Sequence, residues 1–525
     1  MINIKQLKLN VIDNNIDNLY KLIEKKLKIK KSDIKELNII RESIDARRDV
    51  LIVYEVDIKV NNEEELLKRN IKDVNLAPNR NYEFKGIGEH PLINRPVIVG
   101  SGPAGLFCAY NLCLQGYKPL IIERGKKVEE RIIDVNTFWE TNKLDSNSNV
   151  SFGEGGAGTF SDGKLNTLVK DENNRGRMVM ETFISCGAPT DIIYNHHPHI
   201  GTDLLRNVII NLRNKIISLG GEFRYNTQLT NLIIKDNSVS GIIVNNNEEI
   251  KTNCVVLAIG HSARDTFYML NDNNINMESK PFAVGVRIQH PQKLINENQY
   301  GKYSKFLDNA SYKLTYKASN NKGVYSFCMC PGGYVVNAST EDKRLCINGM
   351  SNHNRDSGIA NSAIIVTIDK NDYGDSLFSG LEYQRKLEEN AYSLGSGNIP
   401  IQLLGDYLNN KESNEIRSIK PMFKGNYQFA NLNKLFSNDI NKSLHEAFPY
   451  FDKKIKGFNN YDAVLSGIEA RTSSPIRIIR DDNYVSNIKG IYPCGEGAGY
   501  AGGITSASID GIKVSEAICN YYKKW

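Results

Sequence analysis

Residues 97–105 read VIVGSGPAG, a short run of branched apolar residues that leads into three glycines spaced G-x-G-x-x-G. The run predicts a buried strand, and the glycines suit a turn into a helix. The first glycine allows the tight turn, the second leaves room for a pyrophosphate against the backbone, and the third lets the helix pack on the sheet. We therefore predict that a dinucleotide contacts Gly100, Ser101, Gly102, Pro103, Ala104 and Gly105.

A second strand, LIIERG at residues 120–125, follows an apolar helix that stops at Gly116. Strand, helix and strand together form a βαβ unit of about 30 residues. Glu123 ends the second strand roughly 20 residues after Gly100, where its carboxylate can accept hydrogen bonds from ribose hydroxyls. We assign Glu123 and its neighbour Arg124 to the dinucleotide site.

The stretch GIYPCGEGAGYAGGITSASID, residues 490–510, distinguishes FAD from NAD. It predicts a strand, a Gly-Glu pair and a glycine-rich entry to a last helix. An extended flavin dinucleotide reaches a second helix N-terminus across the sheet, whereas a plain NAD domain needs no such site. We therefore predict non-covalent FAD with contacts at Gly495, Glu496, Gly503, Ile504 and Thr505. The alternative is a glycine-rich helix entry that binds nothing.

Composition limits the class of protein. The chain has 525 residues, a formal net charge of +6 and nine cysteines, an odd number. The mild charge makes nucleic acid an unlikely partner, because nucleic-acid binders concentrate basic charge on one face. The N-terminus does not resemble a signal peptide, and no apolar run approaches the ~20 residues that span a bilayer. We expect a soluble, reduced, cytoplasmic protein that contacts no membrane.

Segment by segment, the patterns predict an α/β fold. Residues 1–85 suggest a small ferredoxin-like α/β domain, in which residues 2–11 form a strand with one irregularity and residues 16–27 form a helix. A Rossmann-like FAD-binding domain occupies residues 86–275 and 456–525, split by an inserted α+β substrate domain at residues 276–455. Residues 70–96, with three prolines in a polar stretch, indicate a linker.

Several stretches resemble known flavoproteins. The GSGPAG and ERG segments, the Ala258-Ile259-Gly260 turn and the C-terminal Gly-Glu plus helix resemble the glutathione-reductase-like superfamily, in which these places contact FAD. We add Leu229 to this set. More narrowly, SFGEGGAGTFSDGKL (151–165), GHSARDT (260–266), FCMCPGGYVV (327–336) and GIEARTSSPIR (467–477) resemble uncharacterised bacterial FAD-dependent dehydrogenases, also described as NAD(P)/FAD-dependent oxidoreductases. The resemblance implies a flavoprotein with an inserted second domain and supplies no substrate.

Two features of the disulfide reductases in that superfamily are missing from the sequence. A second strand–GxGxxG–helix unit for NAD(P)H is not found, so NAD(P)H as electron donor stays open. Cys108 and Cys113 have the spacing of a redox pair but lie on the helix after the glycines, where they would face the core.

The loop at residues 151–165 is the most unusual stretch, and its glycines suit contact with a flat ring or phosphates. We assign Gly156, Ala157, Gly158 and Thr159 to the cofactor site. Arg131, on the preceding segment, is a secondary candidate for a contact with a phosphate. His196, His197 and His199 lack the companion ligands of a metal site, so we predict no metal. Cys328 and Cys330 could form a redox pair, but we interpret them as reduced cysteines that pack against their neighbours. Lys164, His353, Arg355 and Arg471 are candidates for catalysis. The last three are equally suited to a structural hydrogen bond or salt bridge, and the alternative for Lys164 is a flexible loop without contacts.

The prediction is therefore an FAD-dependent oxidoreductase, a dehydrogenase that moves a hydride through flavin N5 to or from a small or medium-sized substrate, with an anionic substrate permitted. Two alternatives stay open. In an RNA-modifying flavoenzyme, the basic residues Arg41, Arg47 and Arg48 of the first domain would bind RNA, although they also suit a solvated face. In a non-catalytic interaction protein, FAD would be a structural ligand. The oligomeric state is not predicted.

Overall fold

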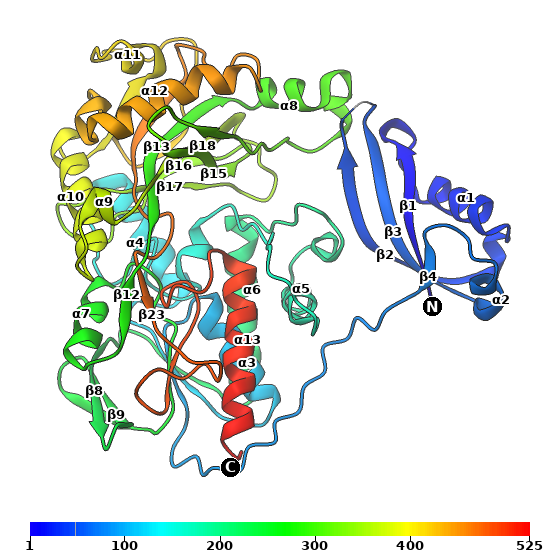
Figure 1. Cartoon of the computed structure of the whole chain (residues 1–525), viewed down its shortest axis with the longest axis horizontal. Helices are drawn as coiled ribbons and strands as arrows, with labels where there is room; N and C mark the ends of the chain where they lie inside the picture. Colours follow the sequence, from blue (N-terminus) through cyan, green and yellow to red (C-terminus); the bar gives the residue numbers. More distant parts are fainter. Residues whose placement is uncertain (48, 525) are drawn as a thin grey trace.

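The computed structural model describes residues 1–47 and 49–524, so Arg48 of the predicted basic patch lies outside the described residues. A small N-terminal module stands beside a much larger body, and an extended segment runs between them (Figure 1). Among the helices of this described part, none combines the length and apolarity that a membrane span requires.

The N-terminal module is a four-stranded antiparallel sheet with two helices. Its elements are β1 (Ile2–Asn10), α1 (Ile16–Leu27), β2 (Ile34–Asp45), β3 (Leu51–Val60), α2 (Glu63–Lys68) and β4 (Val74–Leu76). The strands lie side by side in the order β2-β3-β1-β4. The first strand therefore sits between the third and the fourth.

Local sequence explains these elements. The register of β1 against β3 shifts between Ile4 and Leu7, and Gln6 adopts a φ of 57°, which confirms the predicted irregularity. The bulge lets Ile4 and Leu7 both face the core, because one extra residue restores the alternation of faces. Helix α1 begins where the Asn15 side chain accepts a hydrogen bond from the Asn18 N–H and ends at left-handed Lys28. Its buried residues are Leu19, Ile23 and Leu27.

Residues 77–96 form the extended segment between the module and the body (Figure 1), within the linker that the prolines predicted. Its second half lies along the end of the C-terminal helix. The N–H groups of Gly88 and His90 donate to the carbonyls of Cys519 and Tyr521, and the Lys523 N–H donates back to His90. A Cβ on Gly88 would lie 2.3 Å from the Tyr522 carbonyl oxygen, so only glycine fits this approach.

A five-stranded parallel sheet forms the centre of the lower half of the large body in the view of Figure 1, which we call the lower body. Its order is β24-β11-β5-β6-β7, and it contains the predicted βαβ unit. The strands are β5 (Val97–Val99), β6 (Leu120–Ile122), β7 (Glu222–Arg224), β11 (Val255–Leu257) and β24 (Ile491–Pro493). Helices α3 (Pro103–Leu114) and α13 (Ile504–Tyr521) pack against each other, with the Asn111 side chain donating to the Ser515 hydroxyl in a fully buried contact.

Other elements surround this sheet. Helix α6 (Thr202–Ser218) packs on α3. An antiparallel meander of β8 (Leu229–Lys235), β9 (Ser238–Val244) and β10 (Glu248–Lys251) follows β7. The other α-helices between residues 97 and 275 are α4 (Val128–Thr141), α5 (Arg175–Ser185) and α7 (Arg264–Asp272).

A seven-stranded mixed sheet organises the upper body (Figure 1), in the order β14-β15-β18-β13-β22-β19-β21. Its strands are β13 (Phe282–Pro291), β14 (Thr315–Lys317), β15 (Gly323–Cys330), β18 (Ile359–Ile368), β19 (Ile399–Leu403), β21 (Tyr427–Phe429) and β22 (Val464–Glu469). Strand β22 returns the chain from this sheet toward the lower body.

Two small sheets and five helices complete the body. Strands β12 (Met277–Ser279) and β23 (Ile476–Ile478) pair where the chain leaves and re-enters the lower body. Strands β16 (Tyr334–Asn337), β17 (Ile347–Met350) and β20 (Phe423–Lys424) form a three-stranded sheet. The helices are α8 (Gln292–Tyr300), α9 (Lys370–Tyr373), α10 (Ser379–Leu394), α11 (Leu404–Leu408) and α12 (Asn438–Asp452).

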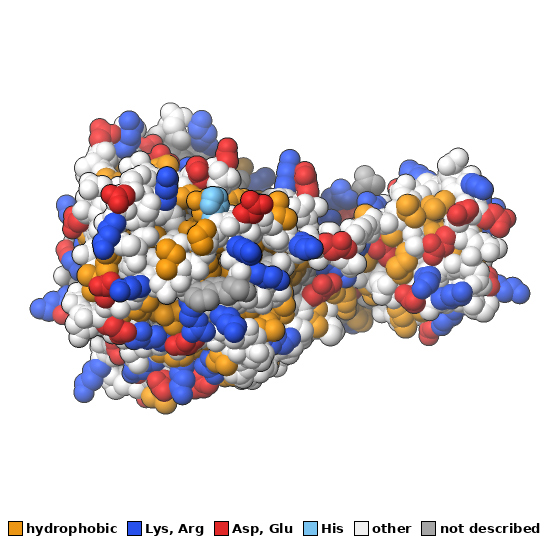
Figure 2. All heavy atoms as spheres, turned by 90° about the horizontal axis from the view of Figure 1, so that it is seen from below, with side chains coloured by type: hydrophobic (Ala, Val, Ile, Leu, Met, Phe, Trp, Pro, Cys, Tyr) orange, Lys and Arg blue, Asp and Glu red, His pale blue; other side chains and the backbone are white. Residues whose placement is uncertain are grey.

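The surface carries both signs of charge. In the view of Figure 2, lysine and arginine side chains are interspersed with aspartate and glutamate over the module and the body alike. The visible face therefore offers no extended basic surface of the kind that a nucleic-acid partner needs.

A buried histidine on β13 makes the stability of the upper body dependent on pH. The His290 ring is fully buried, its Nε2 lies 2.7 Å from the Phe458 carbonyl, and its Nδ1 has no partner among the described residues. Burial lowers the pKa of His290 from 6.5 to about 4. Between these values the unfolded chain binds a proton that the folded chain does not, so acidification favours unfolding.

We therefore expect the free energy of unfolding to fall by up to about 1.4 kcal/mol per pH unit between pH 6.5 and 4 because of this one residue. The variant His290→Gln keeps a donor for Phe458 and removes the titration. Thermal melts at several pH values should show a shallower acid slope for the variant. Equal slopes would contradict the assignment.

Candidate functional site: a cavity between two sheets

A cavity of about 730 Å³ lies between the carboxyl ends of the parallel strands and the wall of the seven-stranded sheet. The N-termini of α3 and α13 both open into it, through Gly102 and Pro103 on one side and Gly503 and Ile504 on the other. Most of the predicted cofactor residues line this cavity: Gly100, Gly102, Pro103, Ala104, Glu123, Arg124, Gly156, Ala157, Gly158, Leu229, Ala258, Ile259, Gly260, Glu496, Gly503 and Ile504.

The three glycines of the opening motif have separate structural roles. Gly100 adopts a φ of 102°, which other residues rarely tolerate. A Cβ on Gly105 would lie 2.0 Å from the Gly100 carbonyl oxygen, so helix α3 packs directly on the turn. A Cβ on Gly102 would meet only the Gly156 Cα, at 3.8 Å. The space beside Gly102 is therefore left for a ligand rather than for protein.

Glu123 fastens the turn to the neighbouring loop. One carboxylate oxygen accepts from the Ser101 N–H at 3.0 Å and the Ser101 hydroxyl at 2.8 Å. The other accepts from the N–H groups of Gly125 and Gly153, both at 3.0 Å. Ser101 itself is buried and, like Gly105, does not line the cavity. A ribose bound here would share Glu123 with these protein donors.

Arg131 lies behind the cavity rather than in it, which differs from the phosphate contact that we predicted. Its fully buried guanidinium donates to four carbonyl oxygens of the loop at residues 149–154 and lies over the Phe160 ring. These contacts fix the loop that carries the cavity-lining glycines. Thr159 is also buried, and its carbonyl accepts from the Thr202 hydroxyl at 2.7 Å.

The C-terminal site is built around the first turn of α13. The Gly495 N–H donates to Asp510 at 2.7 Å, and the Thr505 hydroxyl donates to the Leu165 carbonyl at 2.8 Å, so neither residue lines the cavity. Glu496 does line it, with its carboxylate 2.9 Å from His261 Nδ1. His261 follows the Gly260 turn and lines the cavity beside it.

The structure separates the four catalytic candidates into two pairs. Lys164 and Arg471 line the cavity, whereas His353 and Arg355 do not. Arg355 forms an ion pair with buried Asp162 at 2.7 Å, and Lys164 lies 3.7 Å from the same carboxylate while donating to the Met329 carbonyl. His353 is positioned by its contact with the Ile200 carbonyl at 3.0 Å. Of the two pairs, only the first borders the space where a substrate would bind.

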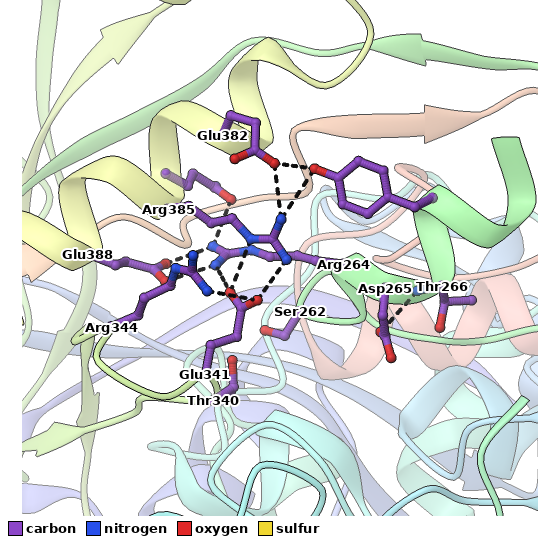
Figure 3. Close-up of polar contacts among 12 residues, drawn as sticks. Ser262, Arg264, Asp265, Thr266, Thr340, Glu341, Arg344, Glu382, Arg385 and Glu388 are labelled. Atoms are coloured by element: carbon purple, nitrogen blue, oxygen red, sulfur yellow. Dashed lines mark hydrogen bonds and ion pairs between the residues drawn. The ribbon is translucent and has the colours of Figure 1, made fainter. Parts of the chain in front are cut away.

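Arg471 belongs to a buried ion-pair cluster that joins the lower body to the upper body. Glu388 on α10, fully buried, accepts from Arg471 at 2.7 and 2.8 Å and from Arg264 at 2.7 and 2.9 Å. Figure 3 shows Arg264 and Arg385 converging on Glu341 beside Glu388. Burial would raise the pKa of Glu388, but the two arginines lower it well below its usual range.

The remaining Arg471 donor contacts the hydroxyls of Ser262 and Thr340. Arg471 is therefore held by protein groups along its whole guanidinium, as the structural alternative for this residue required.

The histidine and cysteine candidates are dispersed. His196 contacts Arg41 of the module, His197 lines the cavity, and His199 stacks on His353. In the described residues, no group of three or more histidine, cysteine or acidic side chains could hold a metal ion. Cys328 and Cys330 line the cavity as free thiols, whereas Cys108 and Cys113 are buried. For the last two, this is the core position that the sequence indicated.

The N-terminal module contacts two segments of the body that adjoin cavity-lining residues. The Glu42 N–H and carbonyl on β2 bond to the backbone of Tyr194 and His196, next to the cavity-lining His197. Tyr303 and Leu307 pack against the module core just before residues 311–315, which also line the cavity. The module thus supports two walls of the site.

Sequence reasoning missed two acidic residues of the cavity, Asp162 and Glu469. Glu469, the last residue of β22, lines the cavity and is ion-paired at 2.7 Å with fully buried Arg287 of β13. The available signal for Glu469 was an acid that ends the otherwise apolar run AVLSGIE at residues 463–469.

Comparison with known proteins agrees with this architecture. Residues 281–472 match the family described as FAD-dependent protein, C-terminal domain-like, and residues 98–128 match an NAD(P)-binding Rossmann-like domain. The first match extends past residue 455 to include β22. Residues 1–59 match a domain of unknown function. The two matched descriptions, together with the Rossmann-like sheet, are those of FAD-dependent proteins.

A protein of Clostridium beijerinckii described as uncharacterized is 46% identical over 517 residues, which cover 97% of this chain and 96% of that protein. The chain belongs to the same family as this clostridial protein.

Solved structures with some likeness include L-proline dehydrogenase from P. horikoshii, with 12% identity, a TM-score of 0.37 and coverage of 82% of this chain and 94% of that one. Glycine oxidase from Bacillus cereus shows 11% identity, a TM-score of 0.31 and coverage of 81% and 94%. Likeness at this level carries no inference about activity.

Proposed function

We propose that the protein is an FAD-dependent dehydrogenase that moves a hydride to or from a small or medium-sized substrate, and that it holds FAD non-covalently in the cavity between the two sheets. The observation that carries the proposal is the pair of helix N-termini, α3 and α13, that open into one cavity of about 730 Å³. Helix N-termini present free N–H groups and partial positive charge to anionic groups of a ligand.

The residues present fit the cofactor. The open space beside Gly102 and the lack of neighbours within 4 Å around Cβ positions at Gly502 and Gly503 leave the backbone accessible at both helix entries. The first entry and Glu123 would hold the pyrophosphate and ribose, and Glu496 with the second entry would hold the flavin half. FAD, when bound, supplies two-electron hydride chemistry.

The protein's own groups would orient the substrate. Lys164 faces the cavity with its ammonium only partly neutralised, because Asp162 also pairs with Arg355. An anionic substrate group would be attracted to this place. Cys328 and Glu469 of the seven-stranded sheet, with Asn348 of β17, close the cavity on the side of the upper body.

We also propose the finer assignments that the architecture favours. The β-α-β-β-α-β order and the antiparallel strand order β2-β3-β1-β4 support a ferredoxin-like N-terminal domain. The parallel sheet, formed from residues 86–275 and 456–525, supports an FAD-binding domain of the glutathione-reductase-like type that is split by an inserted substrate domain.

The first test is the visible spectrum of the purified protein. We expect the absorption of oxidised flavin, with FAD released into the supernatant on heating. Addition of NADH or NADPH without oxygen then shows whether a nicotinamide nucleotide bleaches the flavin. A colourless protein that cannot be reconstituted with FAD would overturn the proposal.

Gly102→Ala tests the cofactor position without disturbing the fold. The added methyl has no heavy atom closer than 3.8 Å, so the apoprotein should melt at the wild-type temperature. Because the methyl occupies the space left beside the helix entry, we expect FAD affinity to fall about tenfold, equivalent to about 1.4 kcal/mol. Fluorescence titration of the apoprotein with FAD measures this, and unchanged affinity would place the cofactor elsewhere.

A further inference from the structure

Glu469 is a carboxylate built into the wall of the proposed substrate space. It ends β22, its side chain is only 4% exposed, and it lines the cavity near Cys328, Asn348 and Gly349. One of its oxygens, Oε2, accepts from Arg287 Nε at 2.7 Å. Among the described residues, no hydrogen-bond donor reaches the other oxygen, Oε1, so that oxygen is available to a ligand.

Arg287 fixes the orientation of this carboxylate. Besides Glu469, its guanidinium donates to the Asn361 side chain at 2.7 Å, the Asn348 side chain at 3.1 Å and the Cys328 carbonyl at 3.1 Å. A fully buried arginine with contacts in four directions has no freedom to follow a moving partner. Glu469 is therefore held with Oε2 toward the protein.

The charged and titratable groups around Glu469 come from several elements. Arg287 is contributed by β13, Cys328 by β15, His261 by the turn after β11, and Cys346 by the segment before β17. Arg287 balances the charge of the carboxylate, and burial raises the pKa of Glu469 in spite of that arginine. A carboxyl in such surroundings can exchange a proton closer to neutral pH than a free one.

Oxidation of an alcohol or amine by hydride removal needs such a group. The C–H bond breaks and its hydrogen leaves with both electrons as hydride, while the O–H or N–H bond breaks and its proton must be accepted. A C=O or C=N bond forms between the two atoms. Glu469 supplies a buried carboxylate with one oxygen open to the cavity, whereas Lys164 is already a cation, Arg471 is fully bonded to protein, and Glu496 and His261 are paired with each other at 2.9 Å.

We propose that Glu469 is the acid–base residue of this cavity, accepting through Oε1 the proton of a substrate hydroxyl or amine as the adjacent C–H bond is oxidised by FAD, and that Arg287 is the residue that positions it. This inference rests on the proposed function. It assigns the substrate to the class of alcohols or amines, and Glu469 releases the proton to solvent after the product leaves.

The test compares Glu469→Gln and Glu469→Asp with the wild type, each loaded with FAD. The midpoint potential of the bound flavin is measured against pH. We expect an inflection from Glu469 in the wild type, a displaced inflection in Glu469→Asp, and none in Glu469→Gln. The matched control is Glu278→Gln, on the exposed pair with Arg477, which should retain the wild-type curve.

A second readout does not depend on the cofactor. Infrared titration of the apoprotein should show, besides buried Glu154, whose pKa burial also raises, a second buried carboxyl that protonates above the range of free glutamate. The band of this second carboxyl should shift in Glu469→Asp and disappear in Glu469→Gln. If Glu469→Gln fails to fold, the wild type and Glu469→Asp still decide the matter by this band. Identical potential curves, or no such carboxyl, would overturn the proposal, whereas absence of bound FAD would instead overturn the proposed function.

Discussion

Replacement of Glu388 by alanine is expected to lower the free energy of unfolding by about 3–5 kcal/mol, because it leaves two buried guanidinium groups without their shared anion. Arg264 is only 2% exposed, and two of the three guanidinium nitrogens of Arg471 donate hydrogen bonds to Glu388. The cluster joins α7 of the lower body to α10 of the upper body. Without Glu388 we therefore expect the lower body and the upper body to unfold less cooperatively. Thermal melts followed by calorimetry would show this as a lower and broader transition.

The adjacent residue provides the control. Glu389 pairs with Arg344 at 2.6 Å, but its side chain is 50% exposed, so Glu389→Ala should cost no more than about 1 kcal/mol. Acidification should have the same effect as the Glu388→Ala substitution. Because the pKa of Glu388 is lowered in the folded chain, the stabilisation by this carboxylate is complete above about pH 4.5 and is lost as the pH falls below that value. Similar melting temperatures for the two variants would show that the cluster contributes no more than a surface pair.

Gly105→Ala is expected to abolish FAD binding and to destabilise the apoprotein by about 1–3 kcal/mol, the usual cost of overpacking. The new Cβ would lie 2.0 Å from the Gly100 carbonyl oxygen, which is backbone and cannot rotate away. Helix α3 would have to move off the sheet, and its N-terminus would leave the cavity. FAD content after purification and the melting temperature of the apoprotein measure the two effects.

Gly323→Ala is the matched control for this variant. Its Cβ would meet only the Thr367 side chain, at 3.5 Å, in ordinary van der Waals contact at the start of β15. We expect both FAD content and melting temperature to remain those of the wild type. If Gly105→Ala behaved in the same way, the third glycine would have no packing role here.

The βαβ unit and the second helix entry were predictable because their causes are local. The glycines at 100, 102 and 105 act through their own backbone. The structure places the first two on the cavity and the third in the first turn of helix α3, against the Gly100 carbonyl. The irregular first strand was predictable for the same reason, since the spacing of Ile4 and Leu7 determines the bulge.

The rest depends on partners that the sequence does not identify. Arg131 looks like a phosphate ligand until the fold brings the carbonyls of residues 149–154 around it. Arg355 and Lys164 share Asp162 only because the loop after β17 meets the glycine-rich loop. Glu469 faces a cavity only because β22 pairs with β13. Such non-local pairing leaves no spacing pattern to read.

The contact of α3 with α13 also determines the order in which the chain can fold. Asn111 and Ser515, which bond across this contact, are 404 positions apart, and β24 completes the sheet only beside β11. During synthesis at about 5–20 residues per second, the edge of β11 and one face of α3 have no packing partner until the last segment of the chain has been made. The N-terminal module has no such dependence, since its strands pair within residues 2–76. The module can therefore be complete on the ribosome long before the cavity beside it exists.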